Sequence, residues 1–209
     1  MPETSLIFPA REYQNRITRL QDRMATAGAD ALLLTTAADV FYVTGFLTRF
    51  WESPARPWFI VVPASGDPVA VIPSIGIALM QRTWITQVRT WDAPDPVDDG
   101  LSLLVDTLAS LVPEQGKIAL PMGLETHLRM PLADYRGLCA QLAPRQVMDG
   151  TDIIQRVREI KSEAEIAKIR TTCAIAGRAF DRVSEIAGVG RPLDQVFRSF
   201  QALLLDEGA

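Results

Sequence analysis

The sequence predicts an α/β fold, with a sheet covered by helices, followed by helices of a different character. Two observations indicate this. Helical patterns alternate with short apolar or β-branched runs, and glycine or proline stands at most of the boundaries between them. After about residue 150 the strand-like runs cease, and amphipathic helical patterns follow to residue 209. An α/β domain that ends near residue 150 accounts for both observations.

The first elements are a long helix and a buried strand. Residues 11–27 carry apolar side chains at helical spacing, and Gly28 follows where a helix often ends in a left-handed residue. The run Ala31–Leu34 is wholly apolar, which is typical of a strand covered on both faces. Residues 39–46 then predict a short helix or turn that ends at Gly45.

A β-hairpin is expected next. The strand-like runs 58–62 and 69–72 are joined by the turn 64–67, and Pro63, Pro68 and Pro73 stand at the strand ends, where a missing N–H is tolerated. Further along, the patterns predict helices over 75–82, 101–112, 131–142 and 149–158, and strands over 87–91, 117–120 and 145–148.

Two amphipathic helices follow the α/β domain. Ser162 and Glu165 form a capping box that opens a helix whose apolar stripe runs from Ile169 to Ala187. Pro192 begins a second helix that continues to about residue 205. Two such helices without a sheet cannot bury their stripes alone, so we expect an interrupted domain. A complete helical hairpin packed back on the first domain is the competing interpretation.

Composition excludes several classes. The net charge is −4 and no Lys/Arg-rich run occurs, so neither nucleic acid nor an anionic membrane is an expected partner. No apolar stretch reaches the ~18 residues that span a bilayer. The first eleven residues lack the pattern of a signal peptide, and two cysteines, Cys139 and Cys173, are expected as buried free thiols. We therefore expect a cytoplasmic protein.

Three segments resemble the creatinase/prolidase/aminopeptidase P group of pita-bread metallohydrolases. Residues 39–46, D-V-F-Y-V-T-G-F, are similar to the family segment N-V-x-Y-L-T-G-F. Residues 56–69 resemble its hairpin of the form V-V-P-x-x-G-x-P. Residues 158–166, R-E-I-K-S-E-A-E-I, are close to R-x-I-K-S-x-x-E-I, the entry into the family's catalytic domain.

The resemblance covers essentially the whole chain and implies its organisation and function. Residues 1–155 would form the N-terminal domain with a mixed sheet, and residues 156–209 would begin an incomplete pita-bread domain. The parent would be a homodimeric hydrolase of C–N bonds with two divalent metal ions, and an Xaa-Pro peptidase is expected first. A creatinase-like amidinohydrolase, a metal-free peptide-binding or chaperone relative, and a stand-alone α/β protein remain as alternatives.

The chemistry for hydrolysis is not expected within these residues. In relatives the metal ligands are two Asp, one His and two Glu, all in the catalytic domain, whereas the single histidine here, His127, precedes the domain junction. One histidine also argues against a Ser–His–Asp or Cys–His set, and no Cys-x-x-Cys or His-x-x-x-His spacing occurs. We therefore assign neither catalytic residues nor metal ligands to this chain.

One segment keeps functional interest. Residues 47–58 combine arginines with aromatic residues in an expected loop, and loops carry function more often than cores do. In creatinase-like dimers the N-terminal domain of one subunit reaches the active site of its partner. We therefore predict that Arg49, Phe50, Trp51 or Arg56 lines a substrate pocket across the dimer. Arginine would bind a carboxylate there, and an aromatic ring would cover an apolar or cationic group.

Overall fold

The computed structural model describes residues 7–53 and 56–209. The chain forms two compact units, Met1–Glu159 and Ile160–Ala209, and each is described by itself. Residues 54 and 55 of the predicted loop, and residues 1–6 of the segment without a signal-peptide pattern, lie outside the described part.

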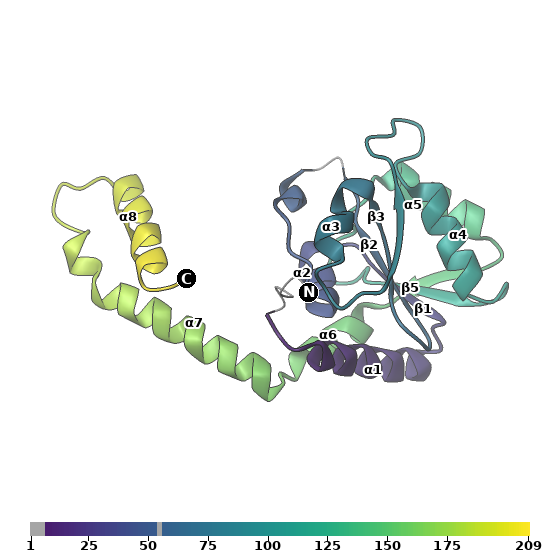
Figure 1. Cartoon of the computed structure of the whole chain (residues 1–209), viewed down its shortest axis with the longest axis horizontal. Helices are drawn as coiled ribbons and strands as arrows, with labels where there is room; N and C mark the ends of the chain where they lie inside the picture. The colour runs from purple at the N-terminus through teal and green to yellow at the C-terminus, as the bar shows by residue number, and fades with distance from the viewer. Residues whose placement is uncertain (1–6, 54–55) are drawn as a thin grey trace. The chain divides into compact units, whose positions relative to one another are not determined.

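The first unit is built on a six-stranded mixed sheet (Figure 1), which confirms the expected fold class. Its strand order is β4-β3-β2-β1-β5-β6. The antiparallel strand is β2, which pairs with β1 and β3, while the other pairings are parallel. The strands are β1 (Ala31–Leu34), β2 (Phe59–Pro63), β3 (Val69–Pro73), β4 (Gln87–Trp91), β5 (Lys117–Leu120) and β6 (Gln146–Asp149).

The helices cover both faces of this sheet. Helices α1 and α6 lie side by side in Figure 1, and α4 packs with α5. Short 3-10 turns, η1 (Arg49–Glu52) and η2 (Ser74–Gly76), stand in the connections. The α-helices of this unit are α1 (Ala10–Ala27), α2 (Ala37–Thr44), α3 (Ile77–Met80), α4 (Leu101–Leu111), α5 (Leu132–Leu142) and α6 (Thr151–Glu159).

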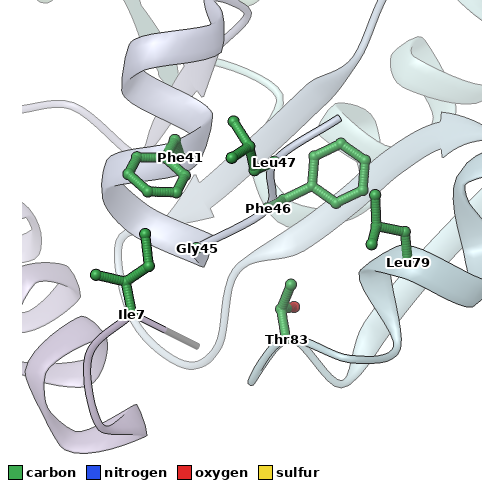
Figure 2. Close-up of a pocket in the computed structure, with 7 residues that line it drawn as sticks. All are labelled: Ile7, Phe41, Gly45, Phe46, Leu47, Leu79 and Thr83. Atoms are coloured by element: carbon green, nitrogen blue, oxygen red, sulfur yellow. The ribbon is translucent and has the colours of Figure 1, made fainter. Parts of the chain in front are cut away.

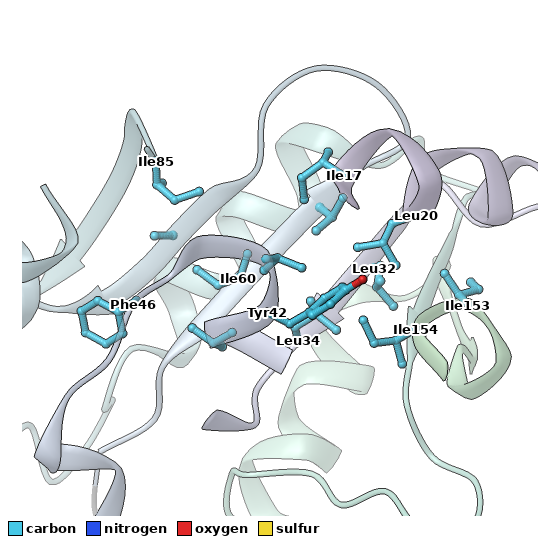
Figure 3. Packing of buried hydrophobic residues seen from close by; sticks show 14 of the residues in the cluster. Ile17, Leu20, Leu32, Leu34, Tyr42, Phe46, Ile60, Ile85, Ile153 and Ile154 are labelled. Carbon is cyan, nitrogen blue, oxygen red and sulfur yellow. The ribbon is translucent and has the colours of Figure 1, made fainter. Parts of the chain in front are cut away.

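Side chains alternate between the two faces of the sheet along each strand, and this divides the core into two layers. Leu32, Leu34 and Ile60 belong to the layer under α1, α2 and α6, which Figure 3 shows with Tyr42 and Ile154. Their strand neighbours Leu33 and Val61 point to the opposite face and pack with α4 and α5. Successive strand residues point to opposite faces, so wholly apolar strands are what a sheet covered on both sides requires.

The local signals that define the first elements are confirmed. Gly28 ends α1 at a φ of 69°, and Gly45 ends α2 at a φ of 77°. Helix α2 begins earlier than expected, because the Thr36 hydroxyl accepts a hydrogen bond from the Asp39 N–H and caps the helix. The β2–β3 turn, residues 64–67, is exposed, and it lies at the edge of the sheet where β1 begins, since Ala31 pairs with Pro63.

The first unit ends after α6. The boundary expected at residue 155 falls inside this helix, where Ile153, Ile154 and Val157 are buried in the layer they share with α1 and α2. These apolar contacts hold the whole of α6 on the first unit. The division between the units therefore follows Glu159 rather than residue 155.

The second unit contains α7 (Glu163–Asp181), the 3-10 turn η3 (Val183–Glu185) and α8 (Leu193–Asp206). The capping box of Ser162 and Glu165 is present. Helix α7 stops earlier than expected, and η3 replaces its last turn. The expected burial of the cysteines is corrected as well: Cys173 on α7 is exposed and Cys139 on α5 is half-buried, and both are free. Among the described residues, no helix combines the length and apolar character that crossing a bilayer requires.

Candidate functional site

The segment predicted to line a substrate pocket starts with an ordered turn. Gly45 ends α2, Phe46 is buried, and the Thr48 hydroxyl accepts a hydrogen bond from the Phe50 N–H at 3.2 Å. The 3-10 helix η1 begins at this cap, and it ends where the Ser53 N–H donates a hydrogen bond to the Phe50 carbonyl. A 3-10 helix therefore stands where the sequence predicted a loop, because local capping by a threonine is enough to fold one turn.

The structure places the four predicted residues on this segment, in two different environments. Arg49 has 97% of its side chain exposed and lies 3.8 Å from Glu52, and Phe50 is exposed as well. Trp51 and Arg56 are half-buried, and the Arg56 guanidinium lies 5.2 Å from the centre of the Phe50 ring. Arg49 and Phe50 are thus exposed to solvent, whereas the half-buried Trp51 and Arg56 pack within the segment.

An aromatic cluster holds the segment to the sheet. Trp58, which leads into β2, is 1% exposed, and its ring centre lies 5.1 Å from that of Phe46 and 6.0 Å from that of Trp51. Phe50 stacks on Trp58 at 6.5 Å. Aromatic pairs at these separations add packing energy to the area they bury. The exposed residues Arg49 and Phe50 are therefore carried by a well-packed base.

Arg129 is the residue of this site that the sequence interpretation missed. Its guanidinium donates hydrogen bonds to the backbone carbonyls of Trp51, Ser53 and Arg56. It also lies 5.0 Å from the centre of the Trp51 ring, within the range of a cation–π contact. Burial lowers the pKa of Arg129 from its ordinary value. No local pattern predicts this clamp, because Arg129 lies more than 70 positions along the chain from the segment it holds.

The sheet topology brings these parts together. Because β1, β3, β4, β5 and β6 run in one direction, their carboxyl ends share one edge, and the antiparallel β2 begins at that same edge. The segment 49–58 leads into β2, Thr35 follows β1, and the loop 121–131 with Arg129 follows β5. Ligands of open α/β sheets bind outside the carboxyl ends of strands, where connections leave in opposite directions.

A small apolar cavity lies next to the aromatic cluster. Figure 2 shows Ile7, Phe41, Phe46, Leu47 and Leu79 around it, with the Thr83 hydroxyl at one side and Gly45 on the backbone. Its volume is about 290 Å³. This is at the lower limit of the size that binds small ligands, so the cavity suits an apolar side chain rather than a large cofactor.

Two buried indole groups add unused donors. Neither the Trp51 nor the Trp58 N–H meets a hydrogen-bond acceptor among residues 7–53 and 56–209. A buried donor without an acceptor costs free energy, and such groups in native proteins call for an explanation. Both nitrogens are buried and so lie out of a ligand's reach, and the exposed guanidinium of Arg49 is the group of this segment that favours a ligand with a carboxylate.

The single histidine takes no part in this site. His127 is exposed in the loop 121–131, as expected, and neighbouring Glu125 adopts a φ of 60°. Within the described ranges, no three His, Cys, Asp or Glu side chains gather closely enough to hold a metal ion. The described residues therefore do not provide the ligand set of a dinuclear metal centre.

These features define an α/β domain whose candidate site lies at the carboxyl edge of a mixed sheet. Residues 16–160 match the family model described as the creatinase/prolidase N-terminal domain, and the chain belongs to this family. The expected family resemblance is thereby confirmed, and the matched range ends next to the division between the two units.

Named relatives extend the similarity beyond the first unit. The chain is 28% identical over 206 residues to a probable dipeptidase PepE from Mycobacterium tuberculosis, covering 96% of this chain and 50% of the relative. Among solved structures, dipeptidase PepE from Mycobacterium ulcerans aligns with a TM-score of 0.74 at 24% identity, over 96% of this chain and 51% of that one. A prolidase from Thermococcus sibiricus aligns with a TM-score of 0.78 at 18% identity, over 94% and 50%. The chain thus spans about half the length of these proteins.

Proposed function

We propose that this chain is the non-catalytic N-terminal part of a metal-dependent C–N hydrolase, first of all an Xaa-Pro dipeptidase, and that it contributes dimerisation and substrate-pocket surface. The observation that carries the proposal is the similarity to dipeptidase PepE, which extends over 96% of the chain. That range includes both the family domain and the helices that follow it.

The arginine-rich segment supplies the chemistry of the proposed surface. A dipeptide substrate carries a carboxylate, and Arg49 offers an exposed guanidinium whose contact with Glu52 is long, at 3.8 Å. Exposed ion pairs of this kind contribute little free energy, so Arg49 can exchange its partner for a substrate carboxylate at small cost. Phe50, which is 39% exposed, adds an aromatic side chain at the next position.

The second unit supports the proposal that these helices belong to a larger domain. Phe180, Leu193, Phe197 and Leu205 have 60% or more of their surface exposed. The core of this unit is small, with Ala179, Ile186 and Leu203 buried together. Helices with exposed apolar faces require a further packing surface, and in our proposal the catalytic domain provides it.

The metal ions belong to the parent in this proposal. Two divalent ions would polarise the scissile carbonyl and activate water. The described residues supply no ligand cluster for them, so we assign no step of hydrolysis to this chain. The chain on its own is accordingly predicted to be inactive, and a cytoplasmic homodimer is the predicted form of the parent.

The test is steady-state kinetics of the intact enzyme with an Xaa-Pro dipeptide. We expect Arg49→Ala to raise KM roughly tenfold, since a lost charged contact is worth about one to two kcal/mol. Trp51→Ala should raise KM by a similar factor, because in this proposal its ring covers part of the substrate. Arg136→Ala is the matched control, because Arg136 is an exposed arginine on α5. Unchanged KM and kcat for both test variants would remove the proposed role of the segment. If light scattering shows that the intact enzyme is a monomer, the proposed role in dimerisation fails.

A further inference from the structure

We infer that Arg129 is the positioning residue that sets the conformation of segment 49–58 and, through it, the affinity of the proposed pocket for substrate. The conformational part of this inference stands on geometry alone. The part that concerns affinity rests on the proposed function above.

The side chain of Arg129 holds the segment on both sides of residues 54 and 55. Its Nη2 donates to the Ser53 carbonyl and, at 3.4 Å, to the Trp51 carbonyl, while its Nη1 donates to the Arg56 carbonyl. The same guanidinium lies over the Trp51 ring. One planar group thus fixes the main chain at three positions and one aromatic side chain, which is the kind of contact that a forked donor makes well.

The backbone of Arg129 is fixed in turn by the central strand. Its N–H donates to the hydroxyl of Thr35 at 3.0 Å, and Thr35 is 3% exposed at the end of β1. A path of direct contacts therefore leads from the rigid sheet through Thr35 and Arg129 to the segment. Through Thr35 and Arg129, the segment that carries Arg49 and Phe50 is therefore held at a defined place on the sheet.

The contacts also require arginine in particular. Arg129 forms no ion pair with a carboxylate in the described part of the chain, so its contacts there are carbonyl dipoles and one aromatic face. A lysine ammonium is a single compact charge without the planar fork, and cannot reach all three carbonyls at once. Arg129→Lys therefore keeps the charge and removes the clamp.

Hydrogen–deuterium exchange of the 209-residue chain tests the conformational part. In Arg129→Lys and Arg129→Ala we expect the amides of residues 49–53 to exchange roughly tenfold faster, while the strands keep their protection, because local opening needs less free energy than global unfolding. Thr35→Val should have the same effect, and Thr35→Ser, which keeps the hydroxyl, should not. Arg136→Ala is the matched control.

Exchange at the wild-type rate in residues 49–53 of folded Arg129→Ala and Thr35→Val would overturn the inference. Loss of protection across the whole sheet in Arg129→Ala would show a general folding role for that variant. The milder variant Arg129→Lys then decides. If Arg129→Lys also loses exchange protection throughout the sheet, a specific positioning role for Arg129 is overturned.

Kinetics of the intact enzyme test the affinity part. We expect Arg129→Lys to raise KM roughly tenfold with kcat within twofold of wild type, the pattern of lost uniform binding. If Trp51→Ala raises KM but Arg129→Lys does not, positioning by Arg129 is overturned while the proposed function stands. If neither Arg49→Ala nor Trp51→Ala changes the kinetics, the proposed pocket role fails. The exchange result then still decides whether Arg129 holds the segment.

Discussion

The guanidinium of Arg158 lies 2.7 Å from the carboxylate of Asp39 and joins the end of α6 to the first turn of α2. The side chain of Asp39 is 9% exposed, and its other oxygen accepts a hydrogen bond from the Thr36 hydroxyl at 2.8 Å. Arg158 opens the R-E-I-K-S sequence at the division between the units. This pair gives that arginine a structural role within the first unit.

Arg158→Ala should lower the free energy of unfolding of the first unit by about 1–2 kcal/mol, because it leaves the buried Asp39 carboxylate short of a charged partner. Arg156→Ala on the same helix is the control, since its pair with Glu159 is exposed on both sides and is worth about 0.5 kcal/mol or less. Urea denaturation followed by tryptophan fluorescence reports on this unit, which contains Trp51, Trp58, Trp84 and Trp91. Equal losses of unfolding free energy in Arg158→Ala and Arg156→Ala would contradict the structural role assigned to Arg158.

Gly76→Ala should destabilise the first unit by about 1–3 kcal/mol through overpacking. A Cβ at this buried position would lie 2.3 Å from Cζ3 of the Trp58 ring, which is itself packed against Phe46 and Trp51. Fluorescence-detected unfolding measures the loss. Gly177→Ala on α7 is the contrasting exchange: a Cβ there meets no atom within 4 Å, so far-UV circular dichroism should show equal or greater helix stability. An unchanged free energy of unfolding in Gly76→Ala would show that the Trp58 ring can shift to make room for the methyl group.

Trp58 allows packing and hydrogen bonding to be separated. Trp58→Phe should lower the free energy of unfolding by only about 1–2 kcal/mol, the packing lost with the smaller ring, because the indole N–H has no acceptor among the described residues. Trp58→Ala should cost about 3–5 kcal/mol, since it empties a fully buried ring position. Equilibrium urea unfolding of both variants is the measurement. A large loss in Trp58→Phe would mean that the N–H has a partner in solution.

Asp149 should make stability depend on pH. Hydrogen bonds from the Thr151 hydroxyl and backbone, with another from the Met122 N–H, hold the pKa of Asp149 below its ordinary value. Since the folded pKa is lowered, the stabilisation is present above the unfolded pKa near 4 and is lost as the pH falls through the folded pKa.

Asp149→Asn should therefore lower Tm by about 2–4 °C at pH 6–7, and the difference from wild type should shrink below about pH 4. Thermal scans across that pH range make the comparison. Asp106→Asn on α4 is the control, because Asp106 is exposed and makes no hydrogen bond or ion pair within the described ranges. A difference that persists unchanged at pH 3 would rule out the charge of Asp149 as the cause.

Local patterns in the sequence predicted most of the fold, because they record local physics. The Gly28 and Gly45 helix ends, the apolar strand Ala31–Leu34 and the capping box at Ser162 each depend on neighbours a few positions away. The predicted end of α7 was wrong, because an apolar stripe shows only which face of a helix is expected to be buried. It does not show what covers that face, and Phe180 is in fact exposed.

The candidate site was predictable in part. The mixture of arginine and aromatic residues in segment 49–58 marked the region, but its ordered turn depends on the single hydroxyl of Thr48. The clamp by Arg129 depends on the sheet topology, which brings the loop after β5 next to the segment that leads into β2. Such long-range contacts leave no periodic signal, and a lone arginine between Leu128 and Met130 carries none.

The β2–β3 turn offers a practical attachment point. Residues 64–67 are exposed at the end of the sheet away from Arg129, and the Gln21 amide braces the turn by donating to the carbonyls of Pro63 and Gly66. A fluorophore, an affinity tag or a surface tether placed there would stay a full strand length from the arginine-rich segment. Immobilised protein would then keep the sheet edge that carries Arg49 and Arg129 free for binding measurements.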